Sequence, residues 1–81
     1  MRVTVRYFAA LRELAGRPSE ALDMPVGATA GAVRMALASR HPAMAGPLSA
    51  CAVAVNQAYS DLERTLEDGD ELAFLPPLGG G

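Results

Sequence analysis

The chain has 81 residues, of which 51% are hydrophobic and 20% are charged, and its formal net charge is -2 at pH 7. A chain of this length forms one small domain and has no room for separate catalytic and cofactor domains. The slightly acidic balance argues against a nucleic-acid partner. All seven basic residues are arginine, which excludes a lysine Schiff base and the linkage of copies through their own lysines.

Two strands are predicted in the first part of the chain. Val3, Val5 and Tyr7 alternate with polar residues, which is the period of a strand with one buried face. Residues 9–15 are predicted as a short helical turn with Leu11 and Leu14 on one side. Residues 19–24 alternate again, so we expect an antiparallel pair of strands with this helical turn in the connection.

The main helix is predicted over Ala30–Arg40, with Thr29 as its N-cap. Its buried face is predicted from residues at helical spacing: Ala30, Val33, Leu37 and Arg40. His41 precedes a proline, which disfavours further helix. Because no second ligand lies at metal spacing, we expect the His41 ring to cap carbonyl groups at the helix end and predict no metal site.

The second half is predicted to contain a connector and three strands. Residues 43–50 include Gly46-Pro47 and are predicted as the connector. The apolar run 51–55 is typical of a buried central strand, and its cysteine is expected to be a small buried hydrophobe. A turn at residues 56–57 leads to a brief extended piece at 58–59. A solvated acidic turn at 67–70 precedes the last strand, 71–75.

This order of elements predicts an α+β fold. One main helix must cover one face of a mixed sheet of about five strands, because nothing else in the chain can do so. That arrangement is the ubiquitin-like β-grasp. We predict a β-grasp domain over residues 1–75 and a flexible C-terminal tail over residues 76–81.

The tail is the one segment in which chemistry is expected. Pro76 and Pro77 cannot extend a strand ladder and favour an extended course, so six residues can reach roughly 20 Å. Gly79, Gly80 and Gly81 have no side chains, so they can enter a narrow channel and present the α-carboxylate to another protein's active site. The alternative for such a tail is an idle, frayed end.

Five segments carry a resemblance to a known family: residues 5–14, 25–29, 40–42, 53–57 and above all 66–81. They resemble the small subunits of molybdopterin synthase, which are ubiquitin-like sulfur carriers, and the resemblance covers essentially the whole chain. One departure is Gly79, a position at which family members vary.

The resemblance implies that an adenylyltransferase related to ubiquitin-activating enzymes uses ATP to adenylate the Gly81 carboxylate. A sulfur donor enzyme then yields a thiocarboxylate. The tail, including Gly79 and Gly80, inserts into the large catalytic subunit, where sulfur passes to cyclic pyranopterin monophosphate and builds the dithiolene of molybdopterin. The chain is thus expected to act as a co-substrate within a heterotetramer and to bind no cofactor itself.

The resemblance also implies a docking surface for the large subunit. Phe8, Tyr59 and Leu75 correspond to the family's apolar contact, and Arg12 is a candidate contact to acidic groups of the partner. The start of the tail completes the predicted set of partner-binding residues: Pro76, Pro77 and Leu78.

Three alternatives remain open from the sequence. A similar carrier can serve tRNA thiolation or cysteine synthesis, a similar tail can form isopeptide bonds as a protein modifier, and a plain β-grasp interaction domain can carry an idle tail. The single cysteine, Cys51, excludes an internal disulfide and a multi-cysteine metal site. The N-terminus does not resemble a signal peptide and no apolar run reaches the roughly 20 residues of a membrane span, so we expect a cytoplasmic protein with no membrane partner.

Overall fold

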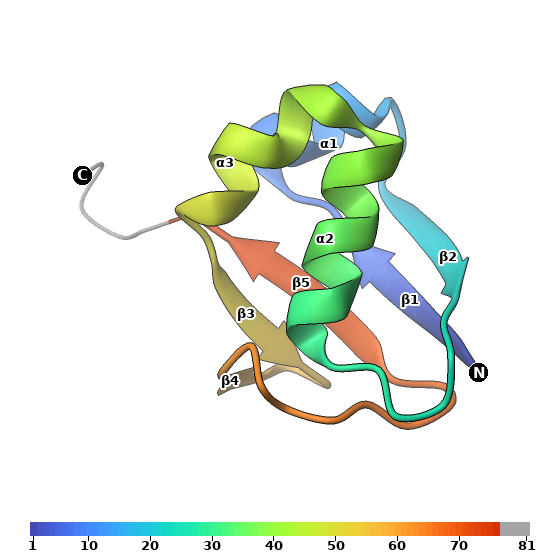
Figure 1. Cartoon of the computed structure of the whole chain (residues 1–81). Helices are drawn as coiled ribbons and strands as arrows, with labels where there is room; N and C mark the ends of the chain where they lie inside the picture. Colours follow the sequence, from blue (N-terminus) through green and yellow to red (C-terminus); the bar gives the residue numbers. More distant parts are fainter. Residues whose placement is uncertain (77–81) are drawn as a thin grey trace.

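The computed structural model describes residues 1–76, and its strands form one five-stranded mixed sheet (Figure 1). The strands are β1 (Arg2–Arg6), β2 (Ser19–Asp23), β3 (Ala52–Val55), β4 (Ala58–Ser60) and β5 (Glu71–Leu75). Their order is β2-β1-β5-β3-β4, with β1 parallel to β5 and every other neighbouring pair antiparallel. The predicted β-grasp fold is confirmed, with β5 rather than the apolar run of β3 as the central strand.

One long helix, α2 (Ala30–Arg40), lies across one face of the sheet (Figure 1). Its bounds are those predicted, and its buried residues are Ala30, Val33 and Leu37. Arg40, predicted on the same face, is exposed instead, because its long side chain reaches the edge of the sheet at Glu20. The core between helix and sheet includes Val3, Val5, Leu22, Val53, Val55, Leu72 and Phe74.

The predicted cap of α2 is confirmed: the Thr29 Oγ1 accepts a hydrogen bond from the Ala32 amide at 3.2 Å. We expect Thr29→Ala to lower the free energy of unfolding by about 1 kcal/mol, because one helix N–H loses its acceptor. Urea unfolding followed by circular dichroism measures this loss. Thr29→Ser keeps the hydroxyl and should retain most of the stability, so equal losses in both variants would contradict the capping role.

Gly31 has a packing reason inside α2. A Cβ at this position would lie 3.1 Å from the Leu62 carbonyl oxygen, and the Gly31 amide itself donates to that oxygen at 2.8 Å. The absence of a side chain therefore lets the segment before β5 run against the first turn of the helix. This close approach offsets the usual cost of glycine in a helix.

The predicted connector 43–50 is wrong, because most of it is helical. A 3-10 helix spans Pro42–Met44, and α3 spans Ala45–Ser49. Each buries one large side chain, Met44 or Leu48, at 1% exposure or less. Pro47 lies in the first turn of α3, where a missing N–H costs nothing, so the Gly-Pro pair does not prevent the helix.

The short helix α1 (Ala9–Ala15) is confirmed, but only one of its two predicted apolar contacts forms. Leu11 is buried, whereas Leu14 is 42% exposed. A step of three residues rotates the side chain by about 60° from the buried direction, and a helix of two turns buries only a narrow stripe.

The turn at residues 56–57 and the turn at residues 67–70 are joined through the buried side chain of Asp70. Asn56 and Gln57 both have positive φ, as a two-residue hairpin turn requires. Asp70, predicted to be solvated with its neighbours, is only 9% exposed. Its carboxylate accepts hydrogen bonds from the Asn56 side chain at 2.9 Å and the Glu67 amide at 2.8 Å, and these bonds hold its pKa below the usual range.

Candidate functional site

The face of the sheet opposite α2 carries a groove with a volume of about 500 Å³. Side chains alternate across a strand, so the residues between the core positions of β1, β3 and β5 all point to this face. We call it the sheet groove, and it is lined by Arg6, Phe8, Ala54, Gln57, Tyr59, Glu71, Ala73 and Leu75.

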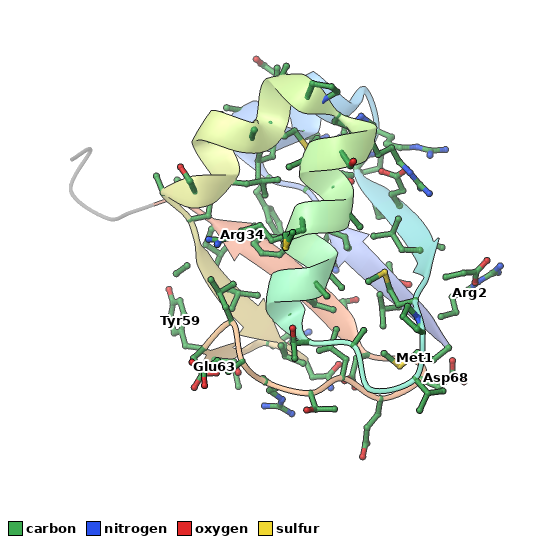
Figure 2. All side chains as sticks on the ribbon, viewed as in Figure 1. Met1, Arg2, Arg34, Tyr59, Glu63 and Asp68 are labelled. Atoms are coloured by element: carbon green, nitrogen blue, oxygen red, sulfur yellow. The ribbon has the colours of Figure 1, made fainter. Side chains whose placement is uncertain are left out.

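Three of the predicted docking residues meet in the sheet groove: Phe8, Tyr59 and Leu75. Phe8 is 42% exposed and Tyr59 is 71% exposed, while Leu75 at the end of β5 is half-buried. Figure 2 shows Tyr59, a residue of the edge strand β4, on the opposite side of the molecule from Arg2 and Asp68. Large apolar side chains gathered in one exposed groove are typical of a protein-binding surface.

Arg6 is a groove residue that the sequence reading did not single out. Its guanidinium lies 5.8 Å from the centre of the Phe8 ring, a cation–π distance. Because alternate strand residues share a face, the spacing of Arg6 and Phe8 was the available signal for this pairing.

A second pocket, of about 190 Å³, lies beside Pro76, where the described chain ends. We call it the root pocket, and it is lined by Phe8, Ala9, Ala10, Leu11, Pro47, Ala50, Cys51 and Pro76. Pro76 is the only predicted tail residue within the described part of the chain, and it is exposed. The predictions for Pro77, Leu78, Gly79, Gly80 and Gly81, including the flexibility of the tail, lie outside the described residues.

Arg12 does not lie in the sheet groove. It lines a separate hollow at the end of α1, together with Glu13, Gly16 and Arg17. Its predicted contact with acidic groups of a partner would therefore fall beside the groove rather than within it.

A buried carboxylate at the β2 edge was also missed from the sequence. Glu20 is 7% exposed, and its carboxylate accepts hydrogen bonds from the Tyr7 hydroxyl at 2.6 Å and the Arg40 guanidinium at 2.8 Å. The His41 Nε2 lies 2.9 Å from the same carboxylate, so the predicted capping of carbonyl groups by this ring is wrong. Glu20 and Leu22 are two residues apart in β2, so both face the core, and this spacing was the available signal for a buried Glu20.

The neighbours of Glu20 decide its charge. Burial opposes ionisation of this carboxyl, but the three hydrogen bonds outweigh burial and lower its pKa to about 2. Burial and the hydrogen bond to Glu20 raise the pKa of the Tyr7 phenol well above its usual range. Glu20 therefore carries its charge and joins β1, β2 and the end of α2.

The described side chains offer little for nucleophilic or metal chemistry. Burial raises the pKa of the Cys51 thiol, which donates a hydrogen bond to the Pro47 carbonyl at 3.2 Å. A thiol of this kind is a poor nucleophile. Residues 1–76 contain no group of three or more His, Cys, Asp or Glu side chains placed to hold a metal ion. Among the helices of this part of the chain, none is long and apolar enough to cross a bilayer.

Comparison with known proteins identifies relatives that match nearly the whole chain. A molybdopterin synthase sulfur carrier subunit of Chlamydomonas reinhardtii is 38% identical over 84 aligned positions, which cover 100% of both chains. The small archaeal modifier protein 1 of H. volcanii matches with a TM-score of 0.87 at 29% identity, over 95% of this chain and 98% of that chain.

A chain in the complex of subunits 1 and 2 of the molybdopterin-converting factor of Helicobacter pylori 26695 matches with a TM-score of 0.74. It is 28% identical, and the match covers 100% of each chain. The family model that matches residues 5–81 is that of the ThiS family. By its match along nearly the whole length and by its β-grasp fold, this chain belongs to the ThiS family.

Proposed function

We propose that this chain is the sulfur-carrier subunit of molybdopterin synthase and that the sheet groove docks on the large catalytic subunit. The observation that carries the proposal is the end-to-end match with a relative of that name, at 38% identity over 100% of both chains. The described part of the chain adds an exposed, mostly apolar groove that reaches Leu75, the residue before the predicted tail.

The proposed chemistry belongs to Gly81. An activating enzyme adenylates its carboxylate with ATP and releases pyrophosphate, and sulfide-level sulfur supplied by a donor enzyme displaces AMP to form the thiocarboxylate. Within the large subunit this sulfur forms a bond to cyclic pyranopterin monophosphate, and water cleaves the acyl–sulfur bond at Gly81 and so restores the carboxylate. Two carriers supply the two sulfur atoms of the dithiolene. The carrier is then a co-substrate in a heterotetramer, and its domain contributes binding and orientation, which bring the reacting groups together.

The likeness to small archaeal modifier protein 1 favours one second candidate, a protein modifier. In that case Gly81 would form an isopeptide bond with a lysine of another protein. The chain itself has no lysine, so copies could not be joined to one another in this way.

Intact-mass measurement tests the proposal. The purified chain is incubated with a molybdopterin synthase adenylyltransferase, ATP and a sulfur donor, and a mass gain equal to exchange of one oxygen for sulfur is expected. Addition of the large subunit and the pterin precursor should then yield the dithiolene and restore the original mass. A chain that gains no sulfur, or gains it without forming dithiolene, contradicts the proposal, and conjugates to lysines of other proteins would support the modifier.

The groove itself gives a further prediction. We expect Tyr59→Ala to weaken binding to the large subunit about 30-fold, because an exposed aromatic anchor is lost, which typically costs about 2 kcal/mol. Isothermal titration calorimetry measures the dissociation constant. Met35→Ala is the matched control, since Met35 is 73% exposed on α2, on the other side of the sheet. Equal effects of the two substitutions would show that the groove is not the docking surface.

A further inference from the structure

The root pocket is built almost entirely of small and apolar side chains. Ala9 and Ala10 of α1 line it together with Pro47 and Ala50 from the region of α3, and Cys51 is its one lining residue whose side chain has a polar hydrogen. The thiol already donates to a backbone carbonyl, so the pocket presents no charged group or free hydroxyl to a ligand. Its occupant must therefore be apolar.

The backbone beside the pocket is strained. Ala9 has a φ of 48°, in the left-handed region that residues with a Cβ rarely adopt. The preceding Phe8 lines the pocket, and the Leu11 amide donates to the Phe8 carbonyl at 3.1 Å. Strain of this kind concentrates at binding sites.

The position of the root pocket is set by the tail. Pro76 is part of its wall, and Gly81 is five positions further along the chain, so the chain length allows at most roughly 18 Å between the pocket and the reactive carboxylate. An enzyme that encloses the tail and acts on Gly81 must cover the surface around Pro76. The pocket thus falls inside the footprint of any such partner.

The root pocket adjoins the sheet groove. Phe8 lines both hollows, and the successive residues Leu75 and Pro76 line one each. A single partner surface that follows β5 toward the tail therefore meets the groove first and the pocket next.

From this geometry we propose that the root pocket receives one apolar side chain from the rim of the tail channel of the large subunit. The inference rests on the proposed function and deepens it. The sheet groove provides the broad contact, and the root pocket fixes the position of the tail relative to the channel.

A charge placed in the root pocket tests this inference. We expect Ala10→Glu to weaken binding of the large subunit at least about tenfold, because the partner's apolar side chain would bury an unpaired charge. Ala45→Glu is the matched control. It makes the same change in the first turn of a helix, where an acid is tolerated, at an exposed residue outside the pocket, and should bind within about twofold of wild type.

Two further measurements distinguish a loss of binding from a loss of folding. Ala50→Met fills the pocket without adding charge and should also weaken binding several-fold. Cys51 is the single cysteine of the chain, so mass spectrometry can follow its reaction with N-ethylmaleimide, and bound large subunit should slow this reaction at least about tenfold.

The outcomes distinguish failure of the proposed function from failure of the root-pocket inference. If wild type does not bind the large subunit, the proposed function fails and the inference fails with it. If wild type binds, but both pocket variants bind equally well and Cys51 reacts at an unchanged rate, the root pocket is not a contact. Weaker binding by both pocket variants, with Ala45→Glu unaffected, supports the inference.

Discussion

Deletion of Gly81 is expected to abolish sulfur transfer while leaving the affinity for the large subunit nearly unchanged. The deletion moves the terminal carboxylate back by up to about 3.6 Å, and a displacement of about 1 Å from the reactive geometry already costs on the order of 100-fold in rate. The sheet groove and the root pocket are untouched by the change. Intact mass after incubation with the activating enzyme and sulfur donor measures sulfur uptake, and calorimetry measures docking.

Gly79→Ala is the matched control for this deletion. It changes the tail by one methyl group and keeps both terminal glycines, at a position where the resembling family varies. We expect it to accept sulfur at nearly the wild-type rate. Full sulfur uptake by the chain that lacks Gly81 would overturn the assignment of the reactive group to this residue.

Replacement of Glu20 by alanine is expected to lower the free energy of unfolding by about 3 kcal/mol at neutral pH. The substitution leaves the buried Tyr7 hydroxyl without an acceptor and removes the link from β2 to Arg40 and His41 at the end of α2. Urea unfolding measures the loss. Glu13→Ala removes an exposed glutamate of α1 and should change the stability by no more than about 0.5 kcal/mol.

The pH dependence of the unfolding free energy of wild type and of Glu20→Ala gives a sharper test of the role of the Glu20 charge. The pKa of Glu20 is about 2 in the folded chain, below its ordinary value of 4.5. Its ionised form therefore stabilises the fold fully above about pH 4.5, and this contribution is lost as the pH falls toward 2. The difference between the two pKa values corresponds to about 3 kcal/mol.

The gap in stability between wild type and Glu20→Ala should accordingly narrow between about pH 5 and pH 3. Glu13→Ala should keep the same small difference from wild type over this range. A gap that stays constant down to pH 3 would show that the Glu20 charge does not contribute to folding.

Local patterns were sufficient for most elements. The alternation at Val3 and Val5, the helical spacing of Val33 and Leu37 and the cap at Thr29 all correspond to the structure, because each depends on residues close together in the chain. The same reasoning missed α3, since Gly46-Pro47 favours a loop locally. The burial of Met44 and Leu48 against the rest of the core stabilises the helical form, and that burial is not a local property.

The sequence by itself determined the class of fold, its main helix, the glycine tail and the resemblance to sulfur carriers. Periodicity, caps and motifs are properties of neighbouring residues, and they can be read without coordinates. Only the tertiary structure decided that β5 lies between β1 and β3, although roughly four-fifths of the chain separates it from β1. This pairing brings Phe8 and Leu75 into the same sheet groove. The packing of α1 and α2 on the sheet likewise leaves Arg12 outside the groove and brings His41 to Glu20, because contacts between distant segments form only when the whole core is packed.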